Sequence, residues 1–295
     1  MNGWLILDKP LGLGSTQGVS AVKRALRTAG HGKVKVGHGG TLDPLASGVL
    51  PIALGEATKL AGRMLDADKA YDFTIRFGIE TATLDAEGEA VAKSDVRPSL
   101  AEVEAVLPRF TGPIEQVPPA FSALKVDGKR AYDLARAGEE VVLATRAVTI
   151  HALTIVGGGA DEVTLSARVS KGTYIRSLAR DIAYALGTVG HVVMLRRTKA
   201  GPFTLDHAIT VDKLDEAAKA ARLQALLLPL TAGLVDIPVL ALTPDQATAL
   251  QQGRTLFGTA ASPGLNLAML GDLPIALVEG GAETRVVRGF NLVSE

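Results

Sequence analysis

The sequence predicts an α+β fold in which a central mixed or antiparallel sheet is flanked by helices and followed by a small β-rich C-terminal domain. Three observations support this prediction. Residues 71–77 alternate apolar and polar side chains, as a half-buried strand does. Strand-like and helix-like segments follow one another without the regular β-α-β order of a doubly wound parallel sheet. Beyond residue 238, short apolar runs separated by turns indicate a second, smaller unit.

The N-terminal segments predict a strand, a helix and a glycine-rich loop. Residues 4–7 are apolar, and the Lys-Pro pair that follows ends the strand. A Ser-Thr pair begins a helix over residues 15–26, whose apolar side chains recur at helical spacing. Glycines are frequent between residues 30 and 40. Residues 44–54 predict a short helix that runs into a strand or turn.

The middle of the chain predicts alternating β segments and helices. A helix is expected where Ser99 provides a cap for an apolar face at helical spacing. The triplet Gly157-Gly158-Gly159 predicts a turn between two β segments. The expected helices cover residues 100–110 and 177–186, and the expected strands cover residues 71–77, 141–156, 163–169 and 192–195.

Pro229, Gly233 and Pro238 predict a domain boundary between residues 230 and 238. We therefore expect a larger domain over residues 1–232 and a small β-rich domain over residues 236–295. The second unit is expected to contain one helix over residues 244–252, capped by Thr243. A chain of 295 residues is long enough for two domains.

Composition excludes several classes of chemistry. The chain contains no cysteine, which excludes disulfides, thiolate zinc sites, iron–sulfur clusters and cysteine nucleophiles. The five histidines show no paired spacing typical of a metal site, so no metal is expected. The first residues lack the apolar stretch of a signal peptide, and no apolar run is long enough for a membrane span. We expect a cytoplasmic protein with no membrane partner.

The charges are distributed unevenly along the chain. The totals cancel, with 31 basic and 31 acidic residues. Residues 1–65 nevertheless hold eight Lys or Arg against three Asp or Glu, and residues 168–207 hold seven against two. If the fold brings these two segments together, they form one positive face suited to nucleic acid. Ordinary variation of surface charge is the alternative explanation.

The segment from Val36 to Pro51 concentrates glycines, one imidazole and one carboxylate. Asp43 precedes Pro44, and such a pair is a common helix start, with aspartate as the N-cap. That interpretation gives Asp43 a structural role only. The alternative is chemical, because His38 and three nearby glycines place the carboxylate beside a loop whose backbone can approach a ligand closely.

Residues 37–51 resemble the signature of the TruB family of pseudouridine synthases, in which a Gly-His pair is followed by a catalytic Asp-Pro at fixed spacing. Other segments resemble motifs of the same family in the same order, although Gly14 stands where the family usually has Ser or Thr. The resemblance extends over about residues 3–210. The other segments that resemble family motifs are Gly3 to Ser15, Lys69 to Tyr71, Gln116 to Lys125, Ser170 to Arg176 and Leu195 to Phe203.

The resemblance implies a pseudouridine synthase fold with a C-terminal PUA-like module, and an activity. The expected reaction isomerises the T-loop uridine at position 55 of tRNA, after that base flips out of the loop. Because it is an isomerisation, no cofactor is expected. The partner is the tRNA T arm, and the protein is expected to act as a monomer.

The resemblance also assigns roles to residues. Asp43 is the expected nucleophile, Arg176 its ion-pair partner, and Tyr71 the aromatic residue that packs on the target base and takes part in proton transfer. The other residues expected to bind the flipped uridine or its surroundings are His38, Tyr174 and Leu195. The expected phosphate contacts are Lys9, Lys23, Arg24, Lys33, Lys35, Lys59, Arg196 and Arg197.

Parts of the sequence are also compatible with two other functions. The glycines at positions 12, 14 and 18 follow a strand, as in a dinucleotide-binding loop, but the third glycine comes one residue late and no acidic strand end follows. The second alternative is an RNA-binding or RNA-folding protein on the same scaffold without catalysis. The presence of Asp43, Tyr71 and Arg176 favours a catalyst.

Overall fold

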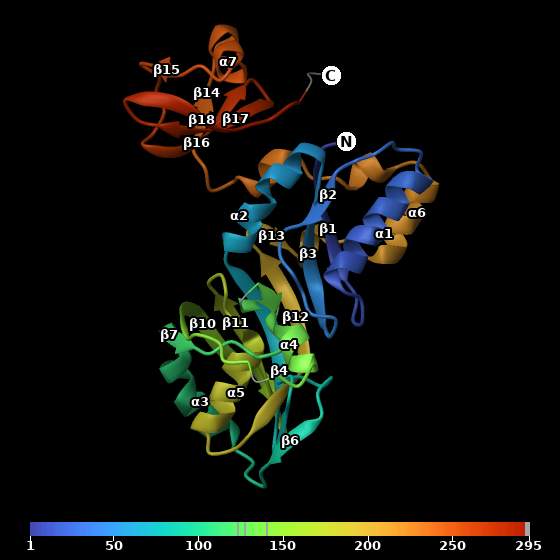
Figure 1. The fold of residues 1–295 in the computed structure, drawn as a ribbon, viewed down its shortest axis with the longest axis vertical. Coiled ribbons are helices and arrows are strands. Elements are labelled where there is room, and N and C mark those ends of the chain that lie inside the picture. The colour runs from blue at the N-terminus through green and yellow to red at the C-terminus, as the bar shows by residue number, and fades with distance from the viewer. Residues whose placement is uncertain (123, 127, 140, 293–295) are drawn as a thin grey trace.

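A large sheet with both parallel and antiparallel pairs runs through the main body of the molecule (Figure 1). The computed structural model describes residues 1–122, 124–126, 128–139 and 141–292. Within these residues, nine strands join in the order β1-β3-β12-β4-β11-β10-β7, with β2 on β3 and β13 on β12. The β3 and β12 strands are parallel, whereas β12 and β4 are antiparallel. The predicted α+β class and mixed sheet are confirmed. The strands are β1 (Gly3–Lys9), β2 (Val36–His38), β3 (Ala46–Leu54), β4 (Lys69–Phe77), β7 (Gly112–Gln116), β10 (Arg146–Gly158), β11 (Glu162–Val169), β12 (Gly190–Ala200) and β13 (Phe203–Thr204).

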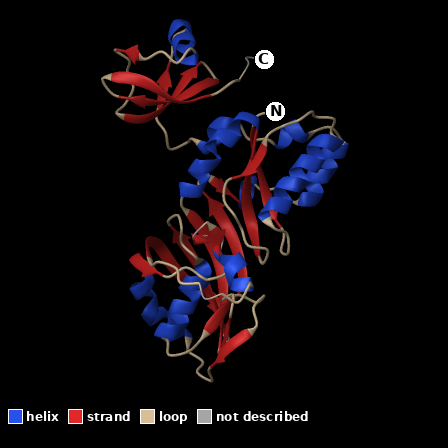
Figure 2. Ribbon diagram, in the orientation of Figure 1, coloured by secondary structure: helices blue, strands red, loops and turns tan. Residues whose placement is uncertain are grey.

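Helices cover the sheet in two groups, which Figure 2 shows beside opposite ends of the main body. The α1 and α6 helices pack side by side next to β1, and α3 and α5 lie at the far end. The helices are α1 (Ser15–Thr28), α2 (Ala61–Asp66), α3 (Leu100–Val106), α4 (Ala131–Arg136), α5 (Ile175–Ala185), α6 (Val211–Lys219) and α7 (Pro244–Gln251). Two small hairpins complete the body: β5 (Ile79–Thr81) with β6 (Ala90–Lys93), and β8 (Lys125–Val126) with β9 (Lys129–Arg130).

Most predicted elements are present within a residue or two of their expected ends. The α1 helix begins at Ser15, and the strand predicted over residues 71–77 is β4. The Ser99 hydroxyl accepts a hydrogen bond from the Glu102 amide and caps α3, as its sequence indicates. Thr243 caps α7 in the same way.

The short helix predicted directly after Asp43 is wrong, whereas the strand into which it was expected to run is present. Ala46–Leu54 forms β3 instead, and its side chains are almost all buried. Because Val49 to Leu54 is apolar on every side, the segment suits an inner strand covered on both faces, and β1 and β12 pair with its two edges. Asp43 is therefore no helix cap. Its carbonyl accepts one hydrogen bond, from the Ala46 amide, in a single turn.

The predicted strand over residues 141–156 begins five residues late. Its first pair joins Arg146 to Gln116, the last residue of β7, so residues before Arg146 have no neighbouring strand to pair with. Val142 is accordingly exposed. The predicted strand over residues 192–195 is the middle of the longer β12, whose edges both have partners.

The dinucleotide-binding alternative is also contradicted. A nucleotide-binding βαβ unit needs a parallel neighbour for its first strand, but β1 pairs antiparallel with β3 along its whole length. Gly14, one of the three glycines in that pattern, is the N-cap of α1.

The C-terminal residues form a separate β-rich module (Figure 1). Among the described residues, five strands join in the order β14-β16-β17-β18-β15, and α7 packs on β17. The strands are β14 (Val239–Ala241), β15 (Leu256–Phe257), β16 (Gly264–Leu270), β17 (Leu273–Gly280) and β18 (Glu283–Gly289). The assignment of residues 1–232 and 236–295 as domains stays a prediction.

The module is attached to the body by packing and by polar contacts. Leu277 and Phe290 belong to the same apolar cluster as Trp4 of β1. The Lys59 ammonium donates to the Gly289 carbonyl at 2.8 Å, and the Asn291 amide donates to Glu56 at 2.7 Å. Among the described residues, no helix is long and apolar enough to cross a membrane.

Candidate active site

A pocket of about 300 Å³ opens in the body where β4, β12, the N-terminus of α5 and the loop before β3 meet. Five of the residues that the sequence predicted for catalysis or uridine binding line it, although they come from four distant parts of the chain. They are Asp43, Tyr71, Tyr174, Arg176 and Leu195. His38 does not line this pocket and lies on β2 instead.

The loop that carries Asp43 is held by hydrogen bonds to its backbone. The Ser15 hydroxyl accepts from the Leu42 amide at 2.7 Å and donates to the Leu42 carbonyl at 2.9 Å. Arg197, which is buried, donates to the carbonyls of Gly40 and Thr41 and, through Nε, to that of Val49. The loop backbone is thus held in place, while the Asp43 side chain stays 41% exposed.

The buried Lys9 ammonium also supports this loop. It donates to the carbonyls of Leu13 and Pro44, so it joins the loop after β1 to the loop before β3. Burial lowers the pKa of Lys9 from 10.5 to about 8, although the Asp43 carboxylate opposes this change.

Arg176 is the partner of Asp43. Its Nη2 atom lies 3.0 Å from Asp43 Oδ2 and 3.0 Å from the Phe121 carbonyl. Its Nη1 atom lies 3.4 Å from Asp85 Oδ2 and 2.9 Å from the Thr83 carbonyl. Because the guanidinium side chain is only 7% exposed, these contacts fix its plane and hence the direction from which it meets Asp43.

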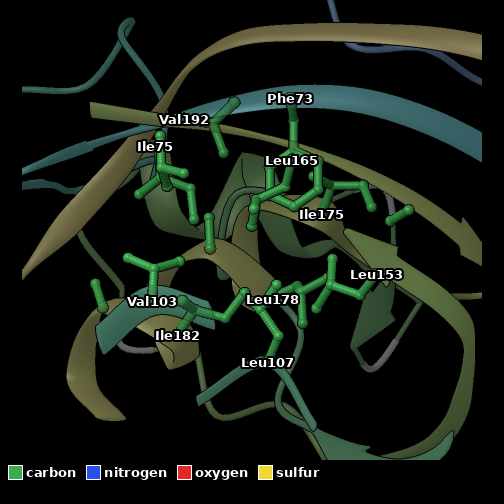
Figure 3. Close-up of a cluster of buried hydrophobic side chains, with 14 of the residues drawn as sticks. Phe73, Ile75, Val103, Leu107, Leu153, Leu165, Ile175, Leu178, Ile182 and Val192 are labelled. Atoms are coloured by element: carbon green, nitrogen blue, oxygen red, sulfur yellow. The ribbon is translucent and has the colours of Figure 1, made fainter. Parts of the chain in front are cut away.

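The position of Arg176 follows from the packing of α5. Ile175, Leu178 and Ile182 lie on the buried side of this helix, in the same apolar cluster as Phe73 and Leu165 of the sheet (Figure 3). This spacing places three apolar residues on one face of a helix. Arg176, one residue after Ile175, is thereby turned towards the pocket.

Gln116 holds the residue that precedes α5. Its side-chain amide donates to the Tyr174 carbonyl at 3.1 Å, and its oxygen accepts from the Tyr174 amide at 2.8 Å. Burial raises the pKa of the Tyr174 phenol, which therefore stays neutral at physiological pH. Gln116 lies in one of the motifs quoted above, and Ala123 of the same motif lies outside the described residues.

Tyr71 and Leu195 reach the pocket from neighbouring strands. In the pairing of β12 with β4, Leu195 is opposite Phe73, and in the pairing with β3 it is opposite Ala46. Both side chains are partly buried and pack against apolar clusters of the body. They give the pocket two apolar walls suited to the faces of a planar ring.

Comparison with known proteins identifies the family. The model for the N-terminal domain of TruB family pseudouridylate synthase matches residues 23–175, and the model for the C-terminal domain of tRNA pseudouridylate synthase B matches residues 176–235. A protein of Novosphingobium aromaticivorans described as tRNA pseudouridine synthase B is 64% identical over 99% of this chain and 98% of its own length. The chain belongs to the TruB family of pseudouridine synthases. It is therefore an isomerase that acts on RNA.

Other relatives agree with this assignment. A Rhodospirillum rubrum protein of the same description is 47% identical over 98% of this TruB-family chain and 94% of its own length. A chain from the crystal structure of a Cbf5–Nop10–Gar1 complex is 27% identical, with a TM-score of 0.74 over 98% of this chain and 84% of that one. The expected pseudouridine synthase fold with a β-rich, PUA-like C-terminal module is confirmed.

Two of the expected phosphate contacts do not fit the TruB-family structure. Lys9 and Arg197 are fully buried, and each donates to several backbone carbonyls around the Asp43 loop. Their charges are therefore used to hold the loop, and a phosphate has no access to them. In the sequence, a buried basic residue and an exposed one look alike.

The remaining basic candidates differ in exposure. Arg196 forms a two-point contact with Asp8, and Lys59 contacts Glu56 and the C-terminal module. Arg24 lies 3.7 Å from Asp215. The exposed positions, which stay candidates for phosphate binding, are Lys23, Arg24, Lys33 and Lys35.

Asp85 is a site residue of this TruB-family enzyme that sequence reasoning missed. It is 6% exposed and lies 3.4 Å from Arg176, on the opposite side of the guanidinium from Asp43. Hydrogen bonds from the Thr83 hydroxyl and the Glu87 amide hold its other oxygen. The sequence signal was a carboxylate in a turn rich in threonine, which ordinarily indicates only an Asx turn.

His38 lies on β2, outside the pocket. Its Nδ1 atom accepts a weak hydrogen bond from the Gly40 amide at 3.4 Å. Burial and, to a lesser extent, the Arg197 guanidinium lower the pKa of His38, so the imidazole is neutral at pH 7. Among the described residues, no group of three acidic or histidine side chains could hold a metal ion.

Proposed function

We propose that this enzyme converts the T-loop uridine of tRNA at position 55 to pseudouridine, with Asp43 as the nucleophile and the uridine flipped out of its loop. One observation carries the proposal. A carboxylate that is 41% exposed faces a pocket of about 300 Å³, and the arginine that orients it is buried. The relatives described as tRNA pseudouridine synthase B support tRNA as the substrate.

The dimensions of the pocket support base flipping. Its volume lies at the small end of ligand pockets, which start at about 300 Å³, and suits one nucleoside rather than stacked bases. A base inside a folded loop cannot reach Asp43, so it has to leave its stack first. His38, outside the pocket but on the neighbouring strand β2, is suited to contact the RNA from which the base has left.

The reaction breaks the bond between N1 and C1′ and forms a bond between C5 and C1′, while the proton on C5 is lost and N1 gains one. Asp43 has to be ionised and held still to attack or stabilise the reacting carbon. The Arg176 guanidinium, 3.0 Å away, holds the carboxylate in position. Tyr71 packs on the base and takes part in the proton transfer at C5, and Tyr174 and Leu195 complete the walls.

The basic surface and the C-terminal module extend the contact with RNA. Exposed lysines on α1 and in the following loop would meet phosphates without reading sequence. We also propose that the protein acts as a monomer in the cytoplasm. It needs no cofactor, because an isomerisation neither adds nor removes electrons.

An unmodified tRNA transcript tests the proposal, with pseudouridine mapped by position. The wild-type protein should modify position 55. Asp43→Asn keeps the shape of the side chain but removes its charge, so its rate should fall below about a tenth of wild type with RNA affinity retained. Asp95→Asn, an exposed aspartate outside the pocket, is the matched control and should be as active as wild type. Modification at another position, or an active Asp43→Asn variant, would contradict the proposal.

A further inference from the structure

The wall of the pocket contains a buried hydroxyl that has no partner. Ser122 lines the pocket together with Asp43 and Tyr174, and it is 4% exposed. Among the described residues, the Ser122 hydroxyl makes no hydrogen bond, and only one other buried side-chain atom, Arg63 Nε, shares this condition. Buried polar groups without partners are rare and mark sites where a ligand or water is bound.

The backbone around Ser122 is held firmly. Its amide donates to the Ala120 carbonyl at 3.0 Å, and its carbonyl accepts from the Tyr132 amide of α4 at 3.0 Å. The preceding residue, Phe121, accepts a hydrogen bond from Arg176. The arginine that orients Asp43 therefore also holds the backbone of the segment that carries Ser122.

Several other polar groups of the pocket are already engaged with the backbone. Lys69 donates to the carbonyls of Leu65 and Ala67, Thr173 donates to that of Ser170, and Arg197 is used as described above. The Ser122 hydroxyl lies close to the Tyr174 phenol and offsets part of the effect of burial on the pKa of Tyr174. The two hydroxyls do not meet the geometry of a hydrogen bond, so the Ser122 group remains available.

A uracil base needs such a group. It carries two carbonyl oxygens and one N–H, and each loses water when the base enters a pocket with apolar walls. During the isomerisation the detached base turns over, so that C5 replaces N1 opposite C1′. This half-turn about the axis through N3 and C6 also exchanges the two carbonyl positions. One donor in the wall can therefore bind a carbonyl both before and after the rotation.

We propose that the Ser122 hydroxyl donates a hydrogen bond to a carbonyl oxygen of the target uracil and so binds the base before and after it turns. The inference rests on the proposed function, because it requires a uridine in this pocket. It assigns Ser122 a contact with the substrate that the roles of Asp43, Tyr71 and Arg176 do not include.

Ser122→Ala separates this role from a structural one. Because the hydroxyl lacks a protein partner, its removal should leave thermal stability unchanged or raise it. The single-turnover rate at saturating T-arm hairpin should fall by about 10- to 100-fold, the loss typical of one hydrogen bond to a buried group. Thr188→Val is the control, since this equally buried hydroxyl donates to the Val96 carbonyl outside the pocket. It should lose stability and keep the wild-type rate.

The acceptor is tested with hairpins that carry 2-thiouridine or 4-thiouridine at the target position. Sulfur is a weaker acceptor than oxygen, so the wild-type enzyme should favour the oxygen substrate, and Ser122→Ala should lose that preference for at least one analogue. The proposal is overturned if Ser122→Ala keeps a rate within about twofold of wild type, if it is destabilised, or if it retains the full preference at both positions. If the wild-type enzyme forms no pseudouridine in the unmodified hairpin, the proposed function itself fails.

Discussion

Replacing Arg176 by lysine is the sharpest test of how the site is built. The guanidinium has contacts with two carboxylates and two carbonyls: Asp43, Asp85, Thr83 and Phe121. These acceptors are contacted by both of its terminal nitrogens, Nη1 and Nη2, and a single ammonium cannot reach all of them. Lysine thus keeps the positive charge but loses the fork that sets the position of Asp43.

The size of the effect follows from the contacts that are lost. An ammonium close to Asp43 would leave at least two of the other acceptors without their hydrogen bond, at about 1.5 to 3 kcal/mol each. Such terms are not additive, so we take the lower end, about 3 kcal/mol in total. At about 1.4 kcal/mol for each factor of ten, the single-turnover rate should fall by roughly 100-fold.

The assay combines single-turnover kinetics at saturating tRNA with equilibrium binding. Binding should stay within a few-fold of wild type, because Arg176 is buried and does not face the solvent. Arg180→Lys, one helical turn further along α5, is the matched control: Arg180 contacts Asp181 outside the pocket, and its variant should keep the wild-type rate. Equal losses of binding and rate in Arg176→Lys would refute the reasoning and make Arg176 a phosphate contact.

Three further predictions concern the support of the site and the RNA surface. Lys9→Met should be less stable than wild type, and the difference in free energy of unfolding should grow between about pH 8 and 10.5. The reason is that the pKa of Lys9 in the folded protein lies below its ordinary value, so folding is favoured as the amine becomes neutral. Urea titrations at several pH values measure this difference. Lys23→Glu should weaken tRNA binding without changing the saturated rate and reduce the slope of log affinity against log salt by roughly 0.7 to 0.9; an unchanged slope would exclude a phosphate contact. Removal of residues 236–295 should weaken tRNA binding but preserve single-turnover chemistry, because none of the proposed catalytic residues lies there. Loss of chemistry at saturating RNA would show that the C-terminal module shapes the site. The truncation should also lower stability because Leu277 and Phe290 pack against Trp4.

The sequence by itself determined the elements and the principal chemical groups. Periodicity gave β4, α5 and the capped helices α3 and α7, because local patterns of apolar residues and caps depend on neighbours a few positions away. The resemblance of their motifs to those of the TruB family selected Asp43 and Arg176 as partners, and the structure places them 3.0 Å apart.

Only the tertiary structure decided what surrounds each group. The segment after Asp43 became a strand rather than a helix because β1 and β12 offer it hydrogen-bonding edges from both sides. Residues 141–145 stayed outside the sheet because β7 ends at Gln116, where their partner would have to continue. In both cases the local sequence favoured one secondary structure, but the presence or absence of a neighbouring strand determined a different one.

The sequence likewise did not show which charged side chains are buried. Lys9 and Arg197 looked like the lysines and arginines of an RNA-binding surface, yet the fold places them beneath the loop that carries Asp43. Asp85 looked like a turn residue, and the fold places it against Arg176, 91 positions away in the chain. Whether a charge faces RNA, a carbonyl or another charge depends on contacts between distant segments, and only the folded chain brings those segments together.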